Sequence, residues 1–158
     1  MDLNNNDILR SIRYTFDLSD KKMGEIFGLA GHQVTPGQVG GWLKTENDPG
    51  WLKCSDAELA NFLNGLIYEK RGKQEGSEAI PEAQLTNNII FRKLKIALNL
   101  KADEVLAILD LADLHISQHQ LSAFFRRPDH KHYRTCNDQV LRNFLKGMQL
   151  KYRAGMSS

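Results

Sequence analysis

The sequence predicts an all-α fold in which two tandem four-helix repeats pack into one helical body with a pseudo-twofold axis. Apolar residues recur at spacings of three and four, which is typical of amphipathic helices. No segment alternates apolar and polar residues as a half-buried strand would. The segment CSDAELANFLNGLIYEKR, which begins at Cys54, returns as CNDQVLRNFLKGMQLKYR from Cys136, and the same offset of 82 residues aligns further positions without a gap. The chain is therefore a tandem duplication.

Helix start and stop signals define the elements of each repeat. Asn4 and Ser19 are candidates for helix N-caps, and Gly31 is a candidate for a helix C-terminus. Thr35 and Pro36 are typical of an N-cap followed by the first helical residue. In the first repeat, the first helix is expected to end near residue 17, and the next three are expected to span about residues 21–30, 36–44 and 55–71. The helices of the second repeat are expected at about residues 88–98, 102–112, 117–126 and 137–153. We assign the repeats to residues 1–72 and 86–158, with a linker at residues 73–85 that is rich in Gly, Glu and Ser.

The fourth helix of each repeat carries the strongest pattern. Ser55 and Glu58 form a capping box before an apolar stripe. Gly65 and Gly147 then interrupt these helices, where glycine costs about 1 kcal/mol relative to alanine, so a packing reason is expected. Asn61 and Asn143 lie one turn earlier on the same edge. We interpret this small-residue edge as a repeat-packing surface on which another backbone approaches, such as the equivalent helix of the other repeat.

Composition limits the class of protein. With 41% hydrophobic and 25% charged residues the chain resembles a globular protein, and no apolar run approaches the roughly 18 residues of a membrane span. The polar N-terminus lacks the pattern of a signal peptide, so we expect a cytoplasmic protein with no membrane partner. Cys54 and Cys136 are expected to be reduced and half-buried, with a disulfide between them as the alternative.

Charge is unevenly divided between the repeats. The formal net charge is +2, but residues 1–82 hold nine basic and thirteen acidic residues, whereas residues 83–158 hold twelve and six. This asymmetry favours an acidic partner such as DNA or RNA, and it would equally serve head-to-tail self-association. Uneven solvated surfaces are the simplest alternative.

The second and third helices of each repeat resemble a helix-turn-helix, in which the second helix enters the major groove of DNA. In the second repeat this helix and the basic segment FFRRPDHKHYR supply groups that could read bases, neutralise phosphates or stack on bases. The candidate nucleic-acid-binding residues are Gln118, Gln120, Arg126, Arg127, Lys131, His132, Tyr133 and Arg134. His119 and Ser122 are further polar groups of the same helix that could read base edges. In the alternative, the arginines pair with acids such as Asp129 and Asp138 on a solvated loop. Phe124 and Phe125 are expected in the core.

Patterns for other chemistry are weak. Histidines cluster at residues 115–132, but the four close Cys and His ligands of a structural zinc site are missing, so we expect no metal. No phosphate-binding loop, nucleophile elbow or paired-carboxylate motif occurs, and we expect no cofactor, no catalytic residues and no small-molecule substrate. The sequence thus favours a non-enzymatic module.

The segments NNDILRSIRY, FLNGLIYEKRGK and RPDHKHYRTCNDQVLRNFL resemble the YehS family of bacterial proteins, which are built from two copies of domain of unknown function 1456. The resemblance covers nearly the whole chain, and it implies a bacterial, all-helical, cytoplasmic protein without implying any catalytic residue. Together with the residues, it leads to the hypothesis of a binding module for nucleic acid. A protein-interaction or self-association module is the alternative, and an enzyme with a non-local site is the third.

Overall fold

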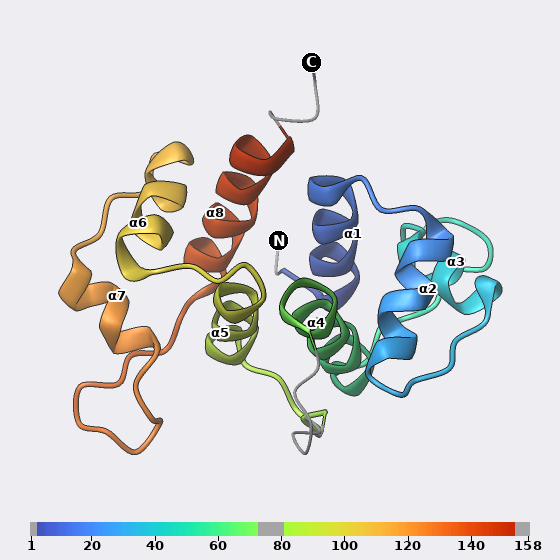
Figure 1. The fold of residues 1–158 in the computed structure, drawn as a ribbon, viewed down its shortest axis with the longest axis horizontal. Helices are drawn as coiled ribbons and strands as arrows, with labels where there is room; N and C mark the ends of the chain where they lie inside the picture. The colour runs from blue at the N-terminus through green and yellow to red at the C-terminus, as the bar shows by residue number, and fades with distance from the viewer. Residues whose placement is uncertain (1–2, 73–80, 154–158) are drawn as a thin grey trace.

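The computed structural model describes residues 3–72 and 81–153, and its regular secondary structure within these ranges is entirely helical. The helices of the first repeat are α1 (Asn5–Phe16), α2 (Asp20–Leu29), α3 (Pro36–Leu43) and α4 (Asp56–Arg71). Those of the second are α5 (Asn87–Ala97), α6 (Ala102–Leu111), α7 (Gln118–Phe124) and α8 (Asp138–Met148), and α8 continues into the π-helical turn η1 (Gln149–Arg153). The repeats lie side by side (Figure 1), which confirms the predicted fold class. Residues 73–80 of the predicted linker lie outside the described residues.

Local capping chemistry explains where the helices begin. The Ser55 hydroxyl accepts a hydrogen bond from the N–H of Glu58 (3.1 Å), and a Glu58 carboxylate oxygen accepts from the N–H of Ser55 (3.0 Å). The predicted capping box is therefore present. α7 ends earlier than the predicted residue 126, because the N–H of Phe125 bonds to the carbonyl of Ser122 (3.1 Å) in a tighter turn.

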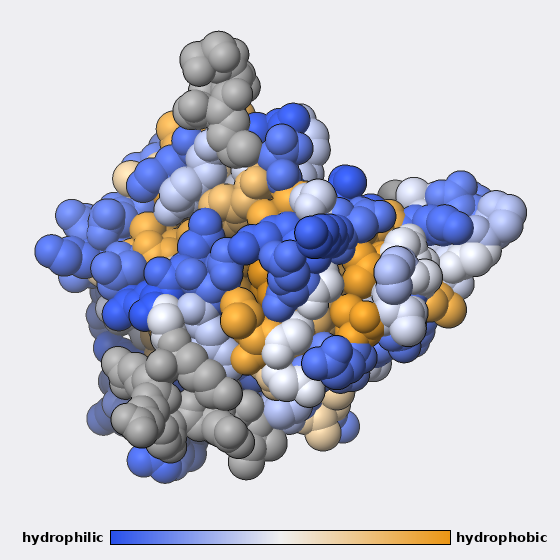
Figure 2. Space-filling model, turned by 45° about the vertical axis from the view of Figure 1, so that its right-hand side comes forward, coloured by the Kyte–Doolittle hydropathy of each residue, from blue (hydrophilic) through white to orange (hydrophobic). Residues whose placement is uncertain are grey.

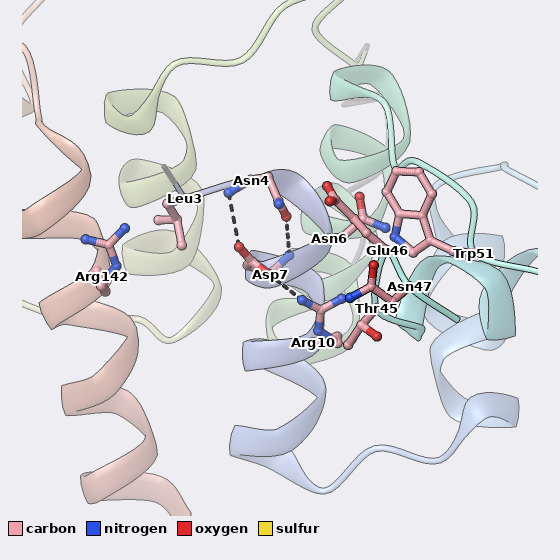
Figure 3. Close-up of a pocket in the computed structure, with 10 residues that line it drawn as sticks. All are labelled: Leu3, Asn4, Asn6, Asp7, Arg10, Thr45, Glu46, Asn47, Trp51 and Arg142. Carbon is pink, nitrogen blue, oxygen red and sulfur yellow. Dashed lines mark hydrogen bonds and ion pairs between the residues drawn. The ribbon is translucent and has the colours of Figure 1, made fainter. Parts of the chain in front are cut away.

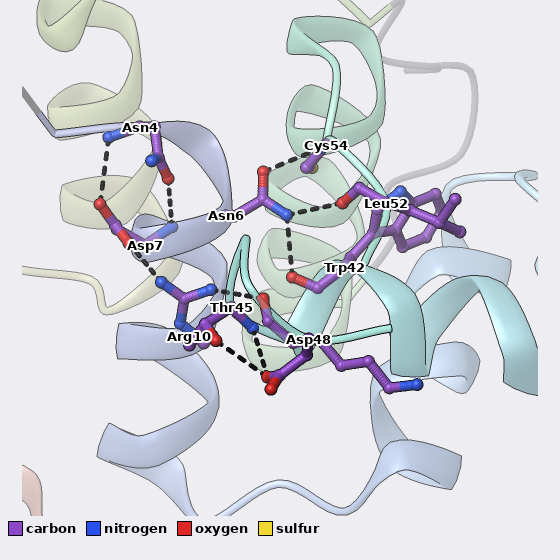
Figure 4. A network of polar contacts seen from close by, with 10 residues as sticks. Asn4, Asn6, Asp7, Arg10, Trp42, Thr45, Asp48, Leu52 and Cys54 are labelled. Carbon is purple, nitrogen blue, oxygen red and sulfur yellow. Dashed lines mark hydrogen bonds and ion pairs between the residues drawn. The ribbon is translucent and has the colours of Figure 1, made fainter. Parts of the chain in front are cut away.

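A buried asparagine near the start of the first helix ties each repeat together. Asn6 donates through Nδ2 to the carbonyls of Trp42 (3.0 Å) and Leu52 (2.8 Å), and its Oδ1 accepts from the N–H of Cys54 (3.0 Å) (Figure 4). One side chain thereby joins α1, the end of α3 and the segment before α4. Because buried backbone groups need partners, this asparagine fixes the loop between α3 and α4.

The second repeat contains the same arrangement. Asn88 donates to the carbonyls of Phe124 (3.0 Å) and Arg134 (2.8 Å), and it accepts from the N–H of Cys136 (2.9 Å). It therefore holds both ends of the loop that follows α7. Each of these partners lies 82 residues after its counterpart in the first repeat, so the duplication preserves this geometry.

Aromatic rings fill the two cores differently. In the first repeat, the Phe27 ring lies 5.1 Å from the ring of Trp42 and 5.1 Å from that of Phe62. In the second, Phe91 is central, with ring distances of 4.6 Å to Phe144 and 4.9 Å to Phe125. Phe124 and Phe125 are half-buried against this core.

The repeats are joined by reciprocal contacts between the first helix of one and the fourth helix of the other. α4 packs along α5, and α8 with η1 packs against α1 (Figure 1). At one end, an Asp56 oxygen accepts from the N–H of Leu85 (2.8 Å), and an Asp138 oxygen accepts from the N–H of Leu3 (3.2 Å). Asp138 is the equivalent of Asp56 and Leu3 is the equivalent of Leu85 at the 82-residue offset, so the two bonds are related as a pseudo-twofold axis requires.

The other end of the interface repeats this reciprocity. Arg71 at the end of α4 donates to the carbonyl of Ile96 (3.3 Å), and the equivalent Arg153 donates to the carbonyl of Tyr14 (2.7 Å). In the second repeat the contact coincides with the π-helical turn, where the Tyr152 ring lies 5.3 Å from that of Phe16. The end of α8 is thereby fitted to α1.

The glycines of the fourth helices meet a different helix from the one suggested by the sequence. A Cβ on Gly65 would lie 1.9 Å from the carbonyl oxygen of Ile26, and one on Gly147 would lie 2.1 Å from that of Ile108. Another backbone does approach each glycine, but it is the second helix of the same repeat. The interpretation that these glycines face the other repeat is therefore wrong.

The asparagines on the same edge follow this pattern. Asn143 donates to the carbonyl of Ala112 at the end of α6 (3.2 Å), which lies within its own repeat. Asn61 is its half-buried equivalent on α4. The small-residue edge thus serves packing inside each repeat, whereas the contact between repeats is made by other residues of the fourth helices.

Large apolar side chains at the surface are scattered over several elements. Within the described ranges, those more than a third exposed are Tyr14, Leu29, Leu52, Ile96, Leu111 and Leu150. On the face seen in Figure 2, bands of hydrophilic residues divide the apolar surface into separate patches. Every helix in the described ranges is too short or too polar to cross a lipid bilayer.

Candidate functional site

Five of the eight candidate residues gather around one groove beside α7. Gln120, Lys131, His132, Tyr133 and Arg134 line a depression of about 690 Å³ together with His119. We call this surface, defined by these six residues, the basic groove. It is formed by α7, the loop that follows it and the beginning of α8, so residues from both ends of the basic segment meet there.

The loop that carries the basic residues has a defined backbone. The N–H of His130 bonds to the carbonyl of Arg127 (2.9 Å), and the N–H of Tyr133 bonds to the carbonyl of His130 (3.0 Å). The N–H of Arg134 bonds to the carbonyl of Ala123 at the end of α7 (3.0 Å). The carbonyl of Arg134 accepts from the side chain of Asn88, which in turn accepts from the N–H of Cys136. Both backbone groups of Arg134 are therefore hydrogen-bonded, and its backbone is fixed beside α7.

The charge of the groove is positive. Among the described residues, no aspartate or glutamate lines it, and the side chains of Lys131, His132 and Arg134 are exposed. Neither Lys131 nor Arg134 forms an ion pair with another residue in the described part of the chain. Their charges are therefore available to an anionic ligand.

Three candidate residues lie outside the basic groove. Gln118 is exposed at the start of α7, and Arg126 is half-buried beside a different pocket. Arg127 is exposed and lies 3.4 Å from an oxygen of Asp129, as the solvated-loop alternative expected. Asp138 does not pair with these arginines, because its oxygens accept from Asn87 and from the N–H of Leu3.

Two polar groups on α7 have roles that the sequence left open. The Oε1 of Gln120 accepts from the N–H of Ser117 (2.8 Å) in a capping box, so only its amide NH₂ is available to a ligand. His119, one of the polar groups of this helix that the sequence indicated could read base edges, also lines the groove. The equivalent position in the first repeat is Gly37, so this ring is specific to the second repeat.

The first repeat lacks a comparable basic surface, because its equivalent residues differ. Arg134 corresponds to Leu52, whose side chain lies against Gly41, and a Cβ on that glycine would be 2.7 Å from Leu52. The second repeat has Ala123 in place of Gly41, so its Cβ occupies this space. The Arg134 side chain therefore cannot occupy the position that Leu52 takes against Gly41, and it is exposed.

A larger pocket lies at the start of α1. It has a volume of about 810 Å³ and includes Asp7, Arg10, Glu46, Trp51 and Arg142 (Figure 3). Its charges are mixed, and Arg10 already donates to Asp7 and to the carbonyl of Lys44 (2.8 Å). This pocket is less suited to a polyanion than the basic groove is.

The cysteines and histidines offer little reactive chemistry. Cys54 and Cys136 are unpaired and only 1% exposed, so they are more buried than predicted, and the alternative of a disulfide is wrong. Burial raises the pKa of each thiol to about 12, which disfavours the nucleophilic thiolate. The rings of His130 and His132 lie 5.6 Å apart, but no group of three metal-ligating side chains converges in residues 3–72 and 81–153.

Comparison with known proteins places these features in a family. The family model described as "Protein of unknown function (DUF1456)" matches residues 5–72 and again residues 87–154. The chain is 45% identical over 144 residues to "Uncharacterized protein YehS" of Escherichia coli (strain K12), an alignment that covers 90% of this chain and 92% of that protein. No solved structure matches the chain. The two matched ranges correspond to the two helical repeats, so the resemblance noted from the sequence is confirmed, and the chain belongs to the DUF1456 family.

Proposed function

We propose that this protein is a non-enzymatic nucleic-acid-binding module whose ligand occupies the basic groove. The observation that carries the proposal is that this groove of about 690 Å³ is bordered by Lys131 and Arg134 and has no acidic side chain among its described lining residues. Neutralisation of phosphates by lysine and arginine is the dominant sequence-independent contribution to nucleic-acid affinity. A phosphodiester backbone therefore suits this surface.

The other groups of the groove suit the remaining parts of a nucleotide. His132 and Tyr133 offer aromatic rings on which bases can stack, and stacking contributes about 1–3 kcal/mol per base. His119 and the amide NH₂ of Gln120 can form hydrogen bonds with base edges or with phosphate. α6 and α7 supply a helix-turn-helix-like pair in which α7 is the recognition helix.

The difference between the repeats supports this assignment. Both repeats keep the asparagine that fixes the loop, but Lys131 and Arg134 replace Pro49 and Leu52. Val140 replaces Glu58, which removes a negative charge from the lining of the groove. Thr135 in place of Lys53 removes one positive charge, so these four exchanges together make the lining more positive by two charges. Binding is therefore assigned to the second repeat.

A binding experiment tests the proposal. Fluorescein-labelled 20-nucleotide DNA and RNA, single-stranded and double-stranded, would be titrated with the protein at 50 mM salt and followed by fluorescence anisotropy. We expect binding to at least one of them that weakens steeply between 50 and 200 mM salt, and we expect Lys131→Ala/Arg134→Ala to reduce affinity at least about tenfold. The absence of binding to every probe at 50 mM salt would refute the proposal.

A charge-matched variant separates the groove from net charge. Lys21→Ala/Lys53→Ala removes two exposed lysines from the first repeat, and we expect affinity to fall by less than about twofold. Equal losses in the two double variants would show that binding depends on overall charge rather than on the groove, and would count against the proposal.

The charge asymmetry also favours a second candidate function, namely self-association of an acidic first repeat with a basic second repeat. Sedimentation at high protein concentration and low salt tests it. A mass that stays monomeric under these conditions would eliminate this candidate.

A further inference from the structure

A second cationic pocket lies on the side of α7 away from the basic groove. It has a volume of about 240 Å³, and its lining includes Lys95, Ala102, Ser122 and Arg126. Within α7, residues 121 and 122 lie on the opposite side of the helix from residues 119, 120, 123 and 124, which line the groove, and Arg126 follows the end of the helix. The two cationic surfaces therefore flank α7.

The cations of this second pocket lack an anionic partner. The Nη1 atom of Arg126 is buried and has no hydrogen-bond partner in the described part of the chain. The ammonium of Lys95 lies 5.1 Å from the centre of the Phe125 ring and forms no ion pair with another described residue. A buried donor without an acceptor is unfavourable, so an anion that reaches Arg126 would relieve this cost.

The equivalent cations of the first repeat have oxygen acceptors that the second repeat does not supply to Lys95 and the Nη1 atom of Arg126. Arg13, the equivalent of Lys95, lies 3.7 Å from an oxygen of Asp20, and Ala102 occupies the position of Asp20 in the second repeat. Lys44, the equivalent of Arg126, donates to the carbonyl of Pro49 (3.0 Å). Both cations of the first repeat therefore have an oxygen acceptor on the protein, whereas in the described part of the chain Lys95 faces the Phe125 ring instead and the Nη1 atom of Arg126 has no hydrogen-bond partner.

Nearby polar groups do not take the place of Asp20. Glu104 on α6 accepts from the N–H of Lys101, and Asp103 accepts from the N–H of Glu104, so both carboxylates are used at the start of α6. Neither lines the pocket. The Ser122 hydroxyl donates to the carbonyl of Gln118 (2.9 Å), so phosphate binding here would depend on Lys95 and Arg126.

We infer that Lys95 and Arg126 bind a phosphate of a second nucleic-acid strand, and that the ligand of this protein is a DNA duplex with α7 in its major groove. This inference rests on the proposed function. An α-helix with its side chains is about 10–12 Å across, and the major groove of B-DNA is about 12 Å wide. Cations on the two sides of α7 are therefore spaced to reach the two backbones that border one major groove, and a single strand would engage only one side.

The test compares duplex with single-stranded DNA. Fluorescence anisotropy with a labelled 20-base-pair duplex, its separate strands and an RNA duplex would be measured for wild type, Lys95→Gln/Arg126→Gln and Lys131→Ala/Arg134→Ala. We expect Lys95→Gln/Arg126→Gln to weaken binding to duplex DNA about tenfold and to lower the magnitude of its salt slope by about 0.9, the contribution of one phosphate contact. Binding to the single strands should change less than twofold.

A substitution that restores the acid of the first repeat gives a second test. Ala102→Asp puts a carboxylate at the first position of α6, where a negative charge is favoured by the helix dipole, so the fold should be retained. We expect it to weaken duplex binding by pairing with Lys95. Arg13→Gln/Lys44→Gln is the matched control and should leave duplex binding within about twofold. Circular dichroism would establish that each variant is folded.

The outcomes separate the inference from the proposed function. If Lys131→Ala/Arg134→Ala weakens binding but neither Ala102→Asp nor Lys95→Gln/Arg126→Gln affects the DNA duplex, the inference is wrong and the basic groove stands. Equal losses for duplex and single strands in Lys95→Gln/Arg126→Gln, or preferential binding of RNA, would also overturn it. If the wild type binds no probe, the proposed function fails as well.

Discussion

Gly65 of α4 lies directly against the carbonyl group of Ile26 in α2, because a Cβ on this glycine would be only 1.9 Å from the carbonyl oxygen. The carbonyl carbon would be 2.8 Å away. These are backbone atoms within a packed helix, so they cannot move aside as a flexible side chain could. The relation repeats between Gly147 and Ile108, which makes close approach of the second and fourth helices a property of the fold.

Substitution of these glycines should therefore destabilise the protein. We expect Gly65→Ala and Gly147→Ala each to lower the free energy of unfolding by at least about 2 kcal/mol, because the added methyl group forces two helices apart. Urea denaturation followed by circular dichroism measures this. Gly40→Ala is the control, since nothing lies within 4 Å of its Cβ position, and alanine should stabilise α3 by up to about 1 kcal/mol. Equal stability of Gly65→Ala and wild type would contradict the packing described.

The buried asparagines give a second prediction. We expect Asn6→Ala and Asn88→Ala each to lower the free energy of unfolding by about 3 kcal/mol, since each removes three hydrogen bonds worth roughly 1 kcal/mol. Asn6→Asp should be no better, because a carboxylate cannot donate to the carbonyls of Trp42 and Leu52. Thermal or urea unfolding measures the loss, with the exposed Asn47→Ala as control. A loss below about 1 kcal/mol in both alanine variants would show that other contacts hold the loops.

Asp138 gives a prediction about pH. The side chain of Asn87 and the N–H of Leu3 donate to this carboxylate and lower its pKa below the ordinary value of 3.8. A carboxyl group with a lowered folded-state pKa stabilises the native protein above its unfolded-state pKa, and this stabilisation is lost as the pH falls through the folded-state pKa. The stability advantage of wild type over Asp138→Asn should therefore be present at pH 7 and shrink below about pH 4.

Two measurements check this prediction. Urea unfolding of wild type and Asp138→Asn from pH 7 to pH 2 gives the difference in free energy, and an advantage that stays constant to pH 2 would rule out the linkage. An NMR titration of the Asp138 carboxyl group should also show its pKa rise in Asn87→Ala, because the largest cause of the lowering is removed.

The helices could be predicted well because their signals are local. The capping box of Ser55 and Glu58 acts within one turn, and apolar spacing identifies the buried face of each helix without knowledge of its partner. The candidate site was predicted only in part. Lys131 and Arg134 meet in the basic groove, whereas Arg126, just beyond the end of α7, lines a separate pocket with Lys95. Lys95 is 31 positions earlier and carries no local signal.

The sequence by itself determined that this protein is a duplicated all-α chain and where its helices begin, because duplication, capping and apolar spacing are written in neighbouring residues. Only the tertiary structure decided which helices meet. Gly65 permits close approach but does not specify a partner, and it meets α2 of its own repeat, while α4 packs along α5. Likewise, folding brings Ala102 beside Lys95, at the position where Asp20 neutralises Arg13 in the first repeat. Such contacts depend on packing between segments that are distant in the chain.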